Sequence, residues 1–184
     1  MDKIIREFKV DRGGRDIIYP FTTFPCVLKK SENAPLEEYL RKTFVEGLPL
    51  GVHLSISEMP ELIIKFTKID YPKLVEMAEK ASYRGSMSKQ HSKVQNYFLD
   101  KDPHTIAIEI PVYNDEMLGH IDIIRLLPSG IIEVLDFKPN AHKETKASSQ
   151  LFRYVQCLAK SLRFPLTQFR AYYFDDKNIY QVTL

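Results

Sequence analysis

Residues 121–138 read I-D-I-I-R-L-L-P-S-G-I-I-E-V-L-D-F-K, and this stretch decides how the second half of the chain folds. Two apolar runs, residues 121–127 and 131–137, flank the sequence Leu127-Pro128-Ser129-Gly130. Proline at the second position and glycine at the fourth are typical of a tight turn. The pattern therefore predicts two strands that pair as a hairpin.

Acidic and basic side chains interrupt both apolar runs. Asp122 lies inside the first run, and Asp136 and Lys138 lie two residues apart at the end of the second. Because side chains alternate along a strand, Asp136 and Lys138 point to the same face. The plain alternative is a surface hairpin with a salt bridge. An unpaired Asp122 among isoleucines would be costly to bury, which favours a site for a hard divalent cation.

Composition limits the class of protein. The chain has 184 residues, 44% hydrophobic and 27% charged, which is ordinary for one soluble globular domain. The net charge of +2 indicates no global basic surface, so any nucleic-acid contact must come from local clusters. Cys26 and Cys157 form no C-x-x-C pair, which predicts a reducing, cytoplasmic compartment. With no apolar run of about 20 residues, we expect no membrane partner.

Periodicity predicts helices in the first half of the chain and then strands and a helix in the order β-β-β-α-β, which indicates an α/β (α+β) fold. We expect one domain over residues 1–184, in which a helical or irregular N-terminal elaboration, 1–100, leads to a catalytic core, 85–184. Residues 1–30 predict short strands or irregular structure. The expected helices are residues 35–44, 57–68, 73–81, 86–99 and 143–162; the expected strands are residues 105–113, 118–127, 131–138, 167–174 and, at an edge of the sheet, 179–184.

Four segments in this order resemble the RecB-like branch of the PD-(D/E)XK nuclease superfamily. They are Glu109-Ile110-Pro111-Val112, Gly119-His120-Ile121-Asp122, Asp136-Phe137-Lys138 and the helical stretch from Gln150 to Tyr154. The resemblance covers roughly the second half of the chain and implies a restriction-endonuclease-like core, in which helices flank a mixed central sheet. Many CRISPR-associated RecB-like exonucleases also carry four cysteines for an iron–sulfur cluster. This chain has two cysteines, so we expect no such cluster.

The resemblance implies a site that binds Mg²⁺ or Mn²⁺. Asp122 and Asp136 would be direct ligands, with the backbone carbonyl of Phe137 as a third. Glu109 is either a further member of the metal site or an acid on the strand surface. An upstream histidine is typical of the branch, and His91 lies on the apolar side of its predicted helix, where a satisfied core histidine is the alternative. The rival histidine, His104, precedes the first predicted strand.

The same resemblance implies roles for the other side chains. Lys138 would orient the attacking water and help to deprotonate it, and orientation is the safer of the two roles. Gln150 and Tyr154 are four residues apart on one predicted helix, so they share a face. In the family this pair touches metal-bound water or the scissile phosphate. The alternative for Tyr154 is that it packs the helix on the sheet.

Function follows as an expectation from this resemblance. It implies a metal-dependent deoxyribonuclease, an exonuclease acting on DNA ends or single strands, in a prokaryotic or virus-infected cytoplasm. One alternative is a structure-specific endonuclease of the junction-resolvase type on the same fold. Another is a nuclease-fold protein that binds nucleic acid or an assembly without cutting. A homodimer, or partners in recombination, CRISPR or viral replication, would be compatible with any of these activities.

Overall fold

The computed structural model describes residues 4–11, 16–23, 34–46, 54–82 and 90–184. Nine strands in these ranges form a single sheet with the order β1-β2-β5-β6-β7-β8-β9-β4, and β3 pairs with β6 outside this path. The strands are β1 (Ile4–Asp11), β2 (Asp16–Thr23), β3 (Leu54–Ser55), β4 (Phe66–Lys68), β5 (Thr105–Tyr113), β6 (Met117–Leu126), β7 (Ile132–Phe137), β8 (Phe169–Phe174) and β9 (Ile179–Val182).

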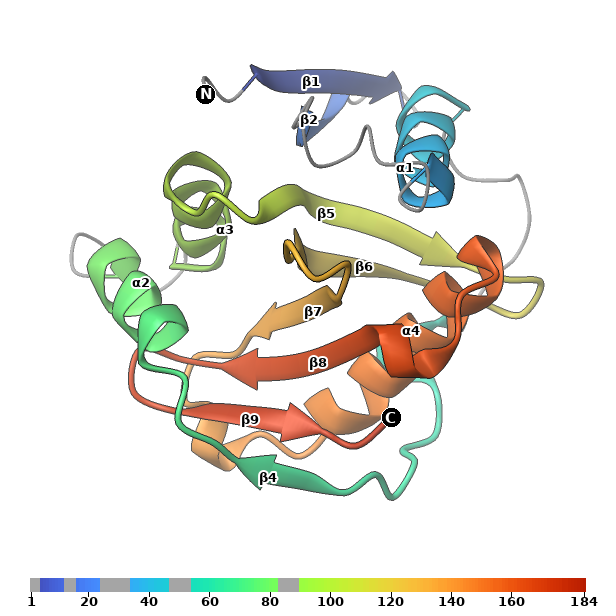
Figure 1. Cartoon of the computed structure of the whole chain (residues 1–184). Helices are drawn as coiled ribbons and strands as arrows, with labels where there is room; N and C mark the ends of the chain where they lie inside the picture. Colours follow the sequence, from blue (N-terminus) through green and yellow to red (C-terminus); the bar gives the residue numbers. More distant parts are fainter. Residues whose placement is uncertain (1–3, 12–15, 24–33, 47–53, 83–89) are drawn as a thin grey trace.

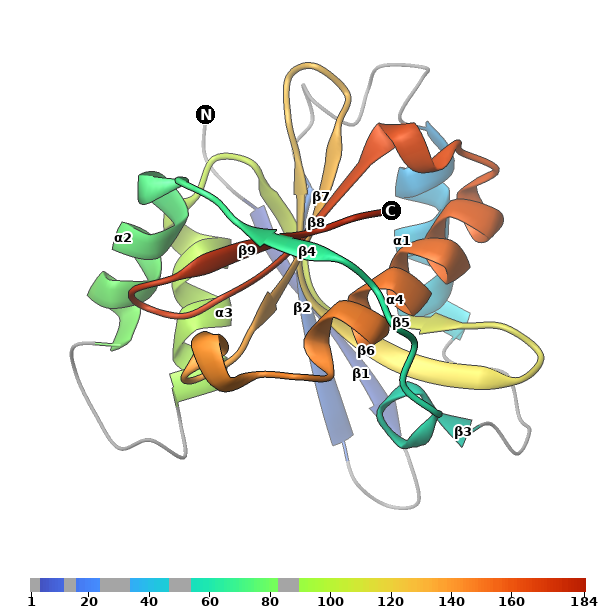
Figure 2. The ribbon, with the colours of Figure 1, turned by 90° about the horizontal axis from the view of Figure 1, so that it is seen from below.

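Helices cover the sheet on both faces (Figures 1 and 2). The helices α2 (Pro72–Ser82) and α3 (Gln90–Lys101) lie on one side, and α1 (Ala34–Glu46) and α4 (Ala147–Leu162) lie on the other. Buried side chains accordingly form two apolar clusters, which we call the α3 face and the α4 face after the helix in each. The predicted fold class, a mixed sheet flanked by helices, is confirmed.

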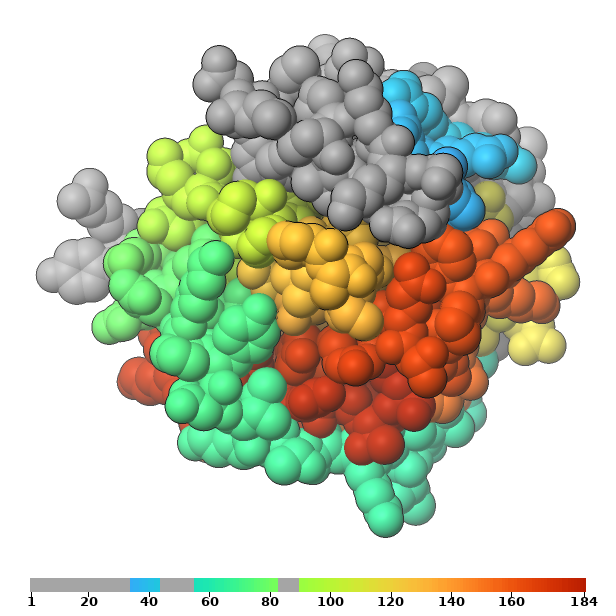
Figure 3. Space-filling view, viewed as in Figure 1, coloured from blue at the N-terminus to red at the C-terminus, as the bar shows by residue number. Residues whose placement is uncertain are grey.

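The predicted hairpin is present. The strands β6 and β7 pair antiparallel, and the amide of Gly130 donates to the carbonyl of Leu127 at 2.9 Å. Gly130 has a φ of 83°, a left-handed conformation that glycine adopts without a steric penalty. The turn reaches the molecular surface (Figure 3). Helix α4 then crosses over from β7 to β8, which pair in parallel, as the predicted β-α-β order requires.

The predicted helix over residues 57–68 is wrong. A short 3-10 turn, Ile56–Glu58, is followed by extended chain and by β4, which pairs antiparallel with β9. Pro60 lacks an amide hydrogen, and Ile63 is fully exposed, so the helical spacing of apolar residues buries no continuous stripe. Because β4 lies outside β9, residues 179–184 do not form an edge strand, which is a second correction.

Other predicted elements are shifted by a few residues. Helix α4 begins at Ala147 rather than at residue 143, because a separate 3-10 turn, Ala141–Lys143, precedes it. The part of the predicted helix 86–99 that the structure describes is α3, and residues 86–89 lie outside the described residues. Of the two alternatives for residues 1–30, the described parts are strands, and β2 joins the sheet beside β5.

No helix among the described residues is both long enough and apolar enough to cross a membrane. Cys157 is buried in α4, and Cys26 lies outside the described residues.

Candidate metal centre

Three acids occupy one row across three neighbouring strands. The pairs Ile108↔Ile123 and Ile110↔Ile121 align β5 with β6, which places Glu109 opposite Asp122. The pair Ile123↔Leu135 aligns β6 with β7, which makes Asp136 the next residue opposite Asp122. We call Glu109, Asp122 and Asp136 the acid row. Sheet register, rather than closeness in sequence, brings these carboxylates together.

The backbone is irregular at this row. Glu109 has a φ of 52°, a left-handed conformation that is unfavourable for a residue with a Cβ atom. Ile108 packs in the cluster on the α3 face, whereas Ile110 packs in the cluster on the α4 face. In a regular strand, residues 108 and 110 would lie on the same face. The regular alternation of side chains in β5 is therefore interrupted at Glu109, which we call the face exchange. In β6, the partner residues Ile123 and Ile121 likewise pack on different faces of the sheet.

Helix α3 supplies the histidine. The Nε2 atom of His91 lies 2.8 Å from Oδ1 of Asp122, and Oδ2 of Asp122 accepts a hydrogen bond of 2.8 Å from the amide of Phe137. Burial alone would lower the pKa of His91, but the hydrogen bond to Asp122 outweighs it and raises the pKa. Burial would raise the pKa of Asp122, but His91 outweighs it and holds that pKa below its ordinary value.

The same face of α3 also reaches Glu109. Gln95 lies one helical turn after His91 and is buried, and its amide Nε2 donates a hydrogen bond to Oε1 of Glu109. Burial raises the pKa of Glu109, and the hydrogen bond from Gln95 only partly opposes this shift. When Glu109 ionises in this buried environment, a nearby positive charge stabilises its carboxylate.

His91, Glu109 and Asp122 converge on one point. Each offers one ligand atom, and these atoms all lie within 4.8 Å of one another. We call these three residues the metal group. Two carboxylates and one imidazole suit a divalent ion such as Mn²⁺ or Mg²⁺, and the nitrogen ligand favours Mn²⁺ somewhat. The side chain of His91 is 41% exposed, so an ion can approach from that side.

Asp136 and Lys138 lie beside this group without being part of it. Nζ of Lys138 lies 3.0 Å from Oδ2 of Asp136, but this oxygen is buried without a hydrogen-bond partner of good geometry. Burial and then the charge of Asp122 raise the pKa of Asp136 well above its ordinary value. Burial would lower the pKa of Lys138, but the two aspartates outweigh it and raise the pKa, which keeps the ammonium charged.

Tyr154 approaches the acid row from the opposite face of the sheet, on α4. Burial raises the pKa of Tyr154 well above its ordinary value, and the charges of Asp136, Asp122 and Glu109 raise it further. A Cβ atom at Gly119 would lie 2.5 Å from Cε1 of Tyr154, so the ring needs a glycine at this position. In the sequence, Gly119 stands out only as the first residue of the segment Gly119-His120-Ile121-Asp122.

Gln150 is half-buried one turn before Tyr154 on α4. Its backbone amide donates to Lys146, and among the described residues no hydrogen bond joins its side chain to the acid row. The structure therefore places Gln150 on the same helix as Tyr154, and its contact with the site stays a prediction.

A buried charged cluster anchors the C-terminal end of α3. Arg125 on β6 donates from Nε to Oδ2 of Asp102 at 2.7 Å and also hydrogen-bonds Glu133 on β7. Thr105 donates to the same Asp102 oxygen at 2.7 Å. All three charged residues are almost fully buried. Removing one partner from such a cluster would leave an uncompensated charge, so α3 is held firmly against β6 and β7.

The rival histidine lies near this cluster. His104 stands between α3 and β5, and its carbonyl accepts a hydrogen bond of 2.9 Å from the amide of Leu126. Burial lowers the pKa of His104, and its charged neighbours are Asp102, Arg125 and Lys73. The structure thus brings His91, and not His104, to the acid row.

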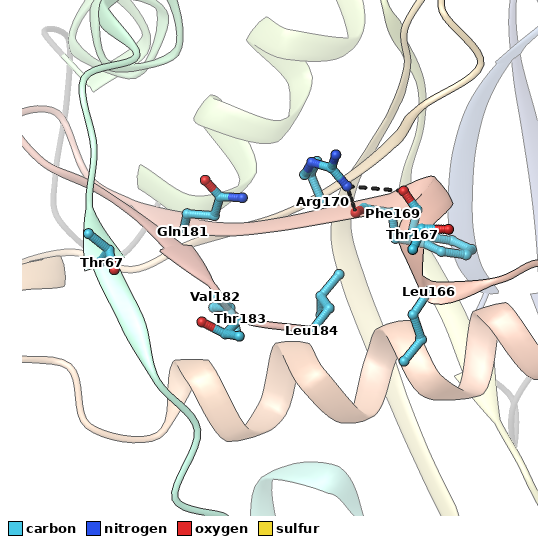
Figure 4. Close-up of a pocket in the computed structure, with 9 residues that line it drawn as sticks. All are labelled: Thr67, Leu166, Thr167, Phe169, Arg170, Gln181, Val182, Thr183 and Leu184. Carbon is cyan, nitrogen blue, oxygen red and sulfur yellow. Dashed lines mark hydrogen bonds between the residues drawn. The ribbon is translucent and has the colours of Figure 1, made fainter.

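A groove of about 340 Å³ lies near the C-terminal end of the described chain (Figure 4). Thr67, Arg170 and Gln181 are among the residues that line it, and the lining includes none of the predicted site residues. One guanidinium nitrogen of Arg170 already donates to the carbonyls of Thr167 and Phe169 at 3.1 and 2.7 Å. We therefore place the candidate site at the acid row rather than at this groove.

Two features of the candidate site, Gln95 and the face exchange at Glu109, have little or no signature in the sequence. The sequence points to Gln95 only after His91 has been assigned to the metal group, because Gln95 lies four residues later on the same helix. The face exchange at Glu109 gives no signal, since nothing in the alternation of residues 105–113 marks a left-handed residue. Comparison with known protein families and with curated proteins finds no match for this chain.

Proposed function

We propose that this protein is a metal-dependent deoxyribonuclease with a RecB-like PD-(D/E)XK core. The observation that carries the proposal is the convergence of His91, Glu109 and Asp122 beside the pair Asp136 and Lys138. A structural salt bridge accounts for Asp136 and Lys138 alone. It does not account for the three further ligand-type side chains, two from the acid row and His91 from α3, whose ligand atoms all lie within 4.8 Å of one another.

The chain's own residues have separate tasks in this proposal. His91, Glu109 and Asp122 would hold a divalent ion, which supplies charge neutralisation for the phosphate and acidifies a bound water. The Lys138 ammonium stays protonated, so it binds the phosphate or orients the water rather than acting as the base. Tyr154 also stays protonated, so its hydroxyl can donate a hydrogen bond to the phosphate or to the attacking water.

Asp136 has a less direct task. Its buried carboxylate lies beside the ammonium and opposite Asp122, so it fixes Lys138 and adds negative charge for a cation. In the metal-free protein this charge is costly, as the raised pKa shows. A bound cation would remove that cost, which couples metal binding to the ionisation of Asp136.

The test is cleavage of end-labelled single-stranded and double-stranded DNA with Mg²⁺, Mn²⁺ or EDTA. We expect cleavage with either ion and none with EDTA. Asp136→Ala and Lys138→Ala should each lower the rate by at least about 100-fold, because every 1.36 kcal/mol of lost transition-state stabilisation is tenfold in rate. Asp115→Ala and Lys177→Ala change exposed residues of the same types and should leave the rate unchanged.

The same assay separates the alternatives. Cleavage of closed circular DNA would favour an endonuclease, whereas degradation of linear DNA alone would favour an exonuclease. Metal-independent DNA binding without cleavage would favour the non-cutting alternative. Full activity in purified Lys138→Ala protein would refute the proposed site.

A further inference from the structure

Gln95 lies in an unusual environment for a helical glutamine. The residue is only 2% exposed, and its side chain reaches from α3 to the sheet, where it donates to the carboxylate of Glu109. A buried amide is costly unless its polar atoms are paired, so this contact is specific. Nothing in the sequence motifs or in the proposed mechanism uses Gln95.

Glu109 needs such a partner more than the other members of the metal group do. Asp122 is held at both oxygens, by His91 and by the amide of Phe137. His91 is held by Asp122 and packs edge-on against the ring of Phe137, with centroids 6.1 Å apart. Glu109 has a longer side chain, with one more rotatable bond than aspartate, on a left-handed backbone. Without a donor, its carboxylate would sample several rotamers.

The chemistry of an amide suits this task. Gln95 is neutral, so it orients the carboxylate without cancelling the charge that a cation requires, as lysine or arginine would. It binds Oε1 and leaves the second oxygen available to a ligand. Because Gln95 and His91 lie one turn apart, a single rigid helix controls the position of two members of the metal group.

We propose that Gln95 is a positioning residue that holds the Glu109 carboxylate in place as the third ligand of a divalent cation. The biological role of this residue rests on the proposed function. The positioning itself can be tested by measuring metal binding in the absence of DNA. Hydrogen-bond partners of metal ligands in other sites are worth about 10- to 100-fold in metal affinity.

The experiment is a calorimetric Mn²⁺ titration of the whole chain. Gln95→Met keeps nearly the same volume and removes the donor, and it should weaken Mn²⁺ binding about 10-fold or more. Asn96→Ala changes an exposed residue on the same helix and should bind like the wild type. Gln95→Asn keeps the amide on a shorter side chain, so it should also weaken binding even if Gln95→Met does not fold.

A double-mutant comparison separates positioning from packing. In a Glu109→Gln background, Gln95→Met should cause little further loss of affinity, because the carboxylate that Gln95 orients is already gone. Wild-type affinity in folded Gln95→Met protein, or equal losses in both backgrounds, would overturn the inference. Wild-type protein that binds Mn²⁺ without cutting DNA would instead refute the proposed function and leave the role of Gln95 intact.

Discussion

The ring of Tyr154 lies so close to Gly119 that a Cβ atom there would stand 2.5 Å from its Cε1 atom. Helix α4 therefore packs against strand β6 at a position, three residues before Asp122, where any larger residue would displace the Tyr154 ring. This contact therefore limits how closely α4 packs against β6 beside the acid row.

Gly119→Ala should displace the Tyr154 ring. We expect a loss of about 1–3 kcal/mol in the free energy of unfolding, which is typical of overpacking a core, together with reduced cleavage. Urea unfolding measures the first effect and the DNA assay the second. In a Tyr154→Leu background the same alanine should cost less, because the clashing ring atoms are absent. Equal costs in both backgrounds would show that the contact is not the cause.

The two histidines should behave differently. His91→Ala removes a member of the metal group, so Mn²⁺ affinity should fall at least about tenfold and the preference should move from Mn²⁺ toward Mg²⁺. His104→Ala should leave metal binding unchanged, since His104 lies beside the Arg125 cluster instead. Titration of both variants with both ions checks this. Loss of metal binding in His104→Ala would mean that the site has been misplaced.

Asp136→Asn should abolish cleavage but stabilise the metal-free protein by about 1 kcal/mol. Substitutions that neutralise a functional residue often raise stability at the cost of activity. Because the folded pKa of Asp136 is raised above its unfolded value, its charge destabilises the fold at high pH, and the penalty disappears as pH falls toward 3.8. The gain from Asp136→Asn should therefore be larger at pH 8 than at pH 5. Thermal unfolding in EDTA measures it, and a gain that grows on acidification would contradict this assignment.

The energetic cost of the left-handed backbone at Glu109 can be measured by comparing the stability of two variants that both lack the carboxylate. Glu109→Gly should be more stable than Glu109→Ala by about 1 kcal/mol, since glycine adopts a positive φ without a Cβ clash. At Tyr113, which lies on the same strand without a positive φ, the order should reverse. Urea unfolding of the four variants decides. Alanine as the more stable residue at both positions would rule out backbone strain at Glu109.

The local pattern of the sequence was sufficient for much of the fold. Strand β5 was predicted with its exact bounds, and the hairpin turn at Leu127 to Gly130 followed from proline and glycine. These features depend on alternation and turn conformation, which act over a few residues. The predicted helix over residues 57–68 is wrong. Its apolar residues have helical spacing, but part of the segment forms β4, which pairs with β9, a strand more than 110 residues later in the chain.

The candidate site likewise combines residues that local sequence identifies with residues that only the fold brings together. Sequence alone identified Asp136 and Lys138 as neighbours on one face of a strand, because a strand repeats every two residues. It left open whether His91 or His104 joins the acids and whether Glu109 belongs with them. Only the tertiary structure decided these points, through the β5–β6–β7 register, the face exchange at Glu109 and the packing of α3. Contacts of that kind depend on how distant segments pack together, and no local pattern encodes them.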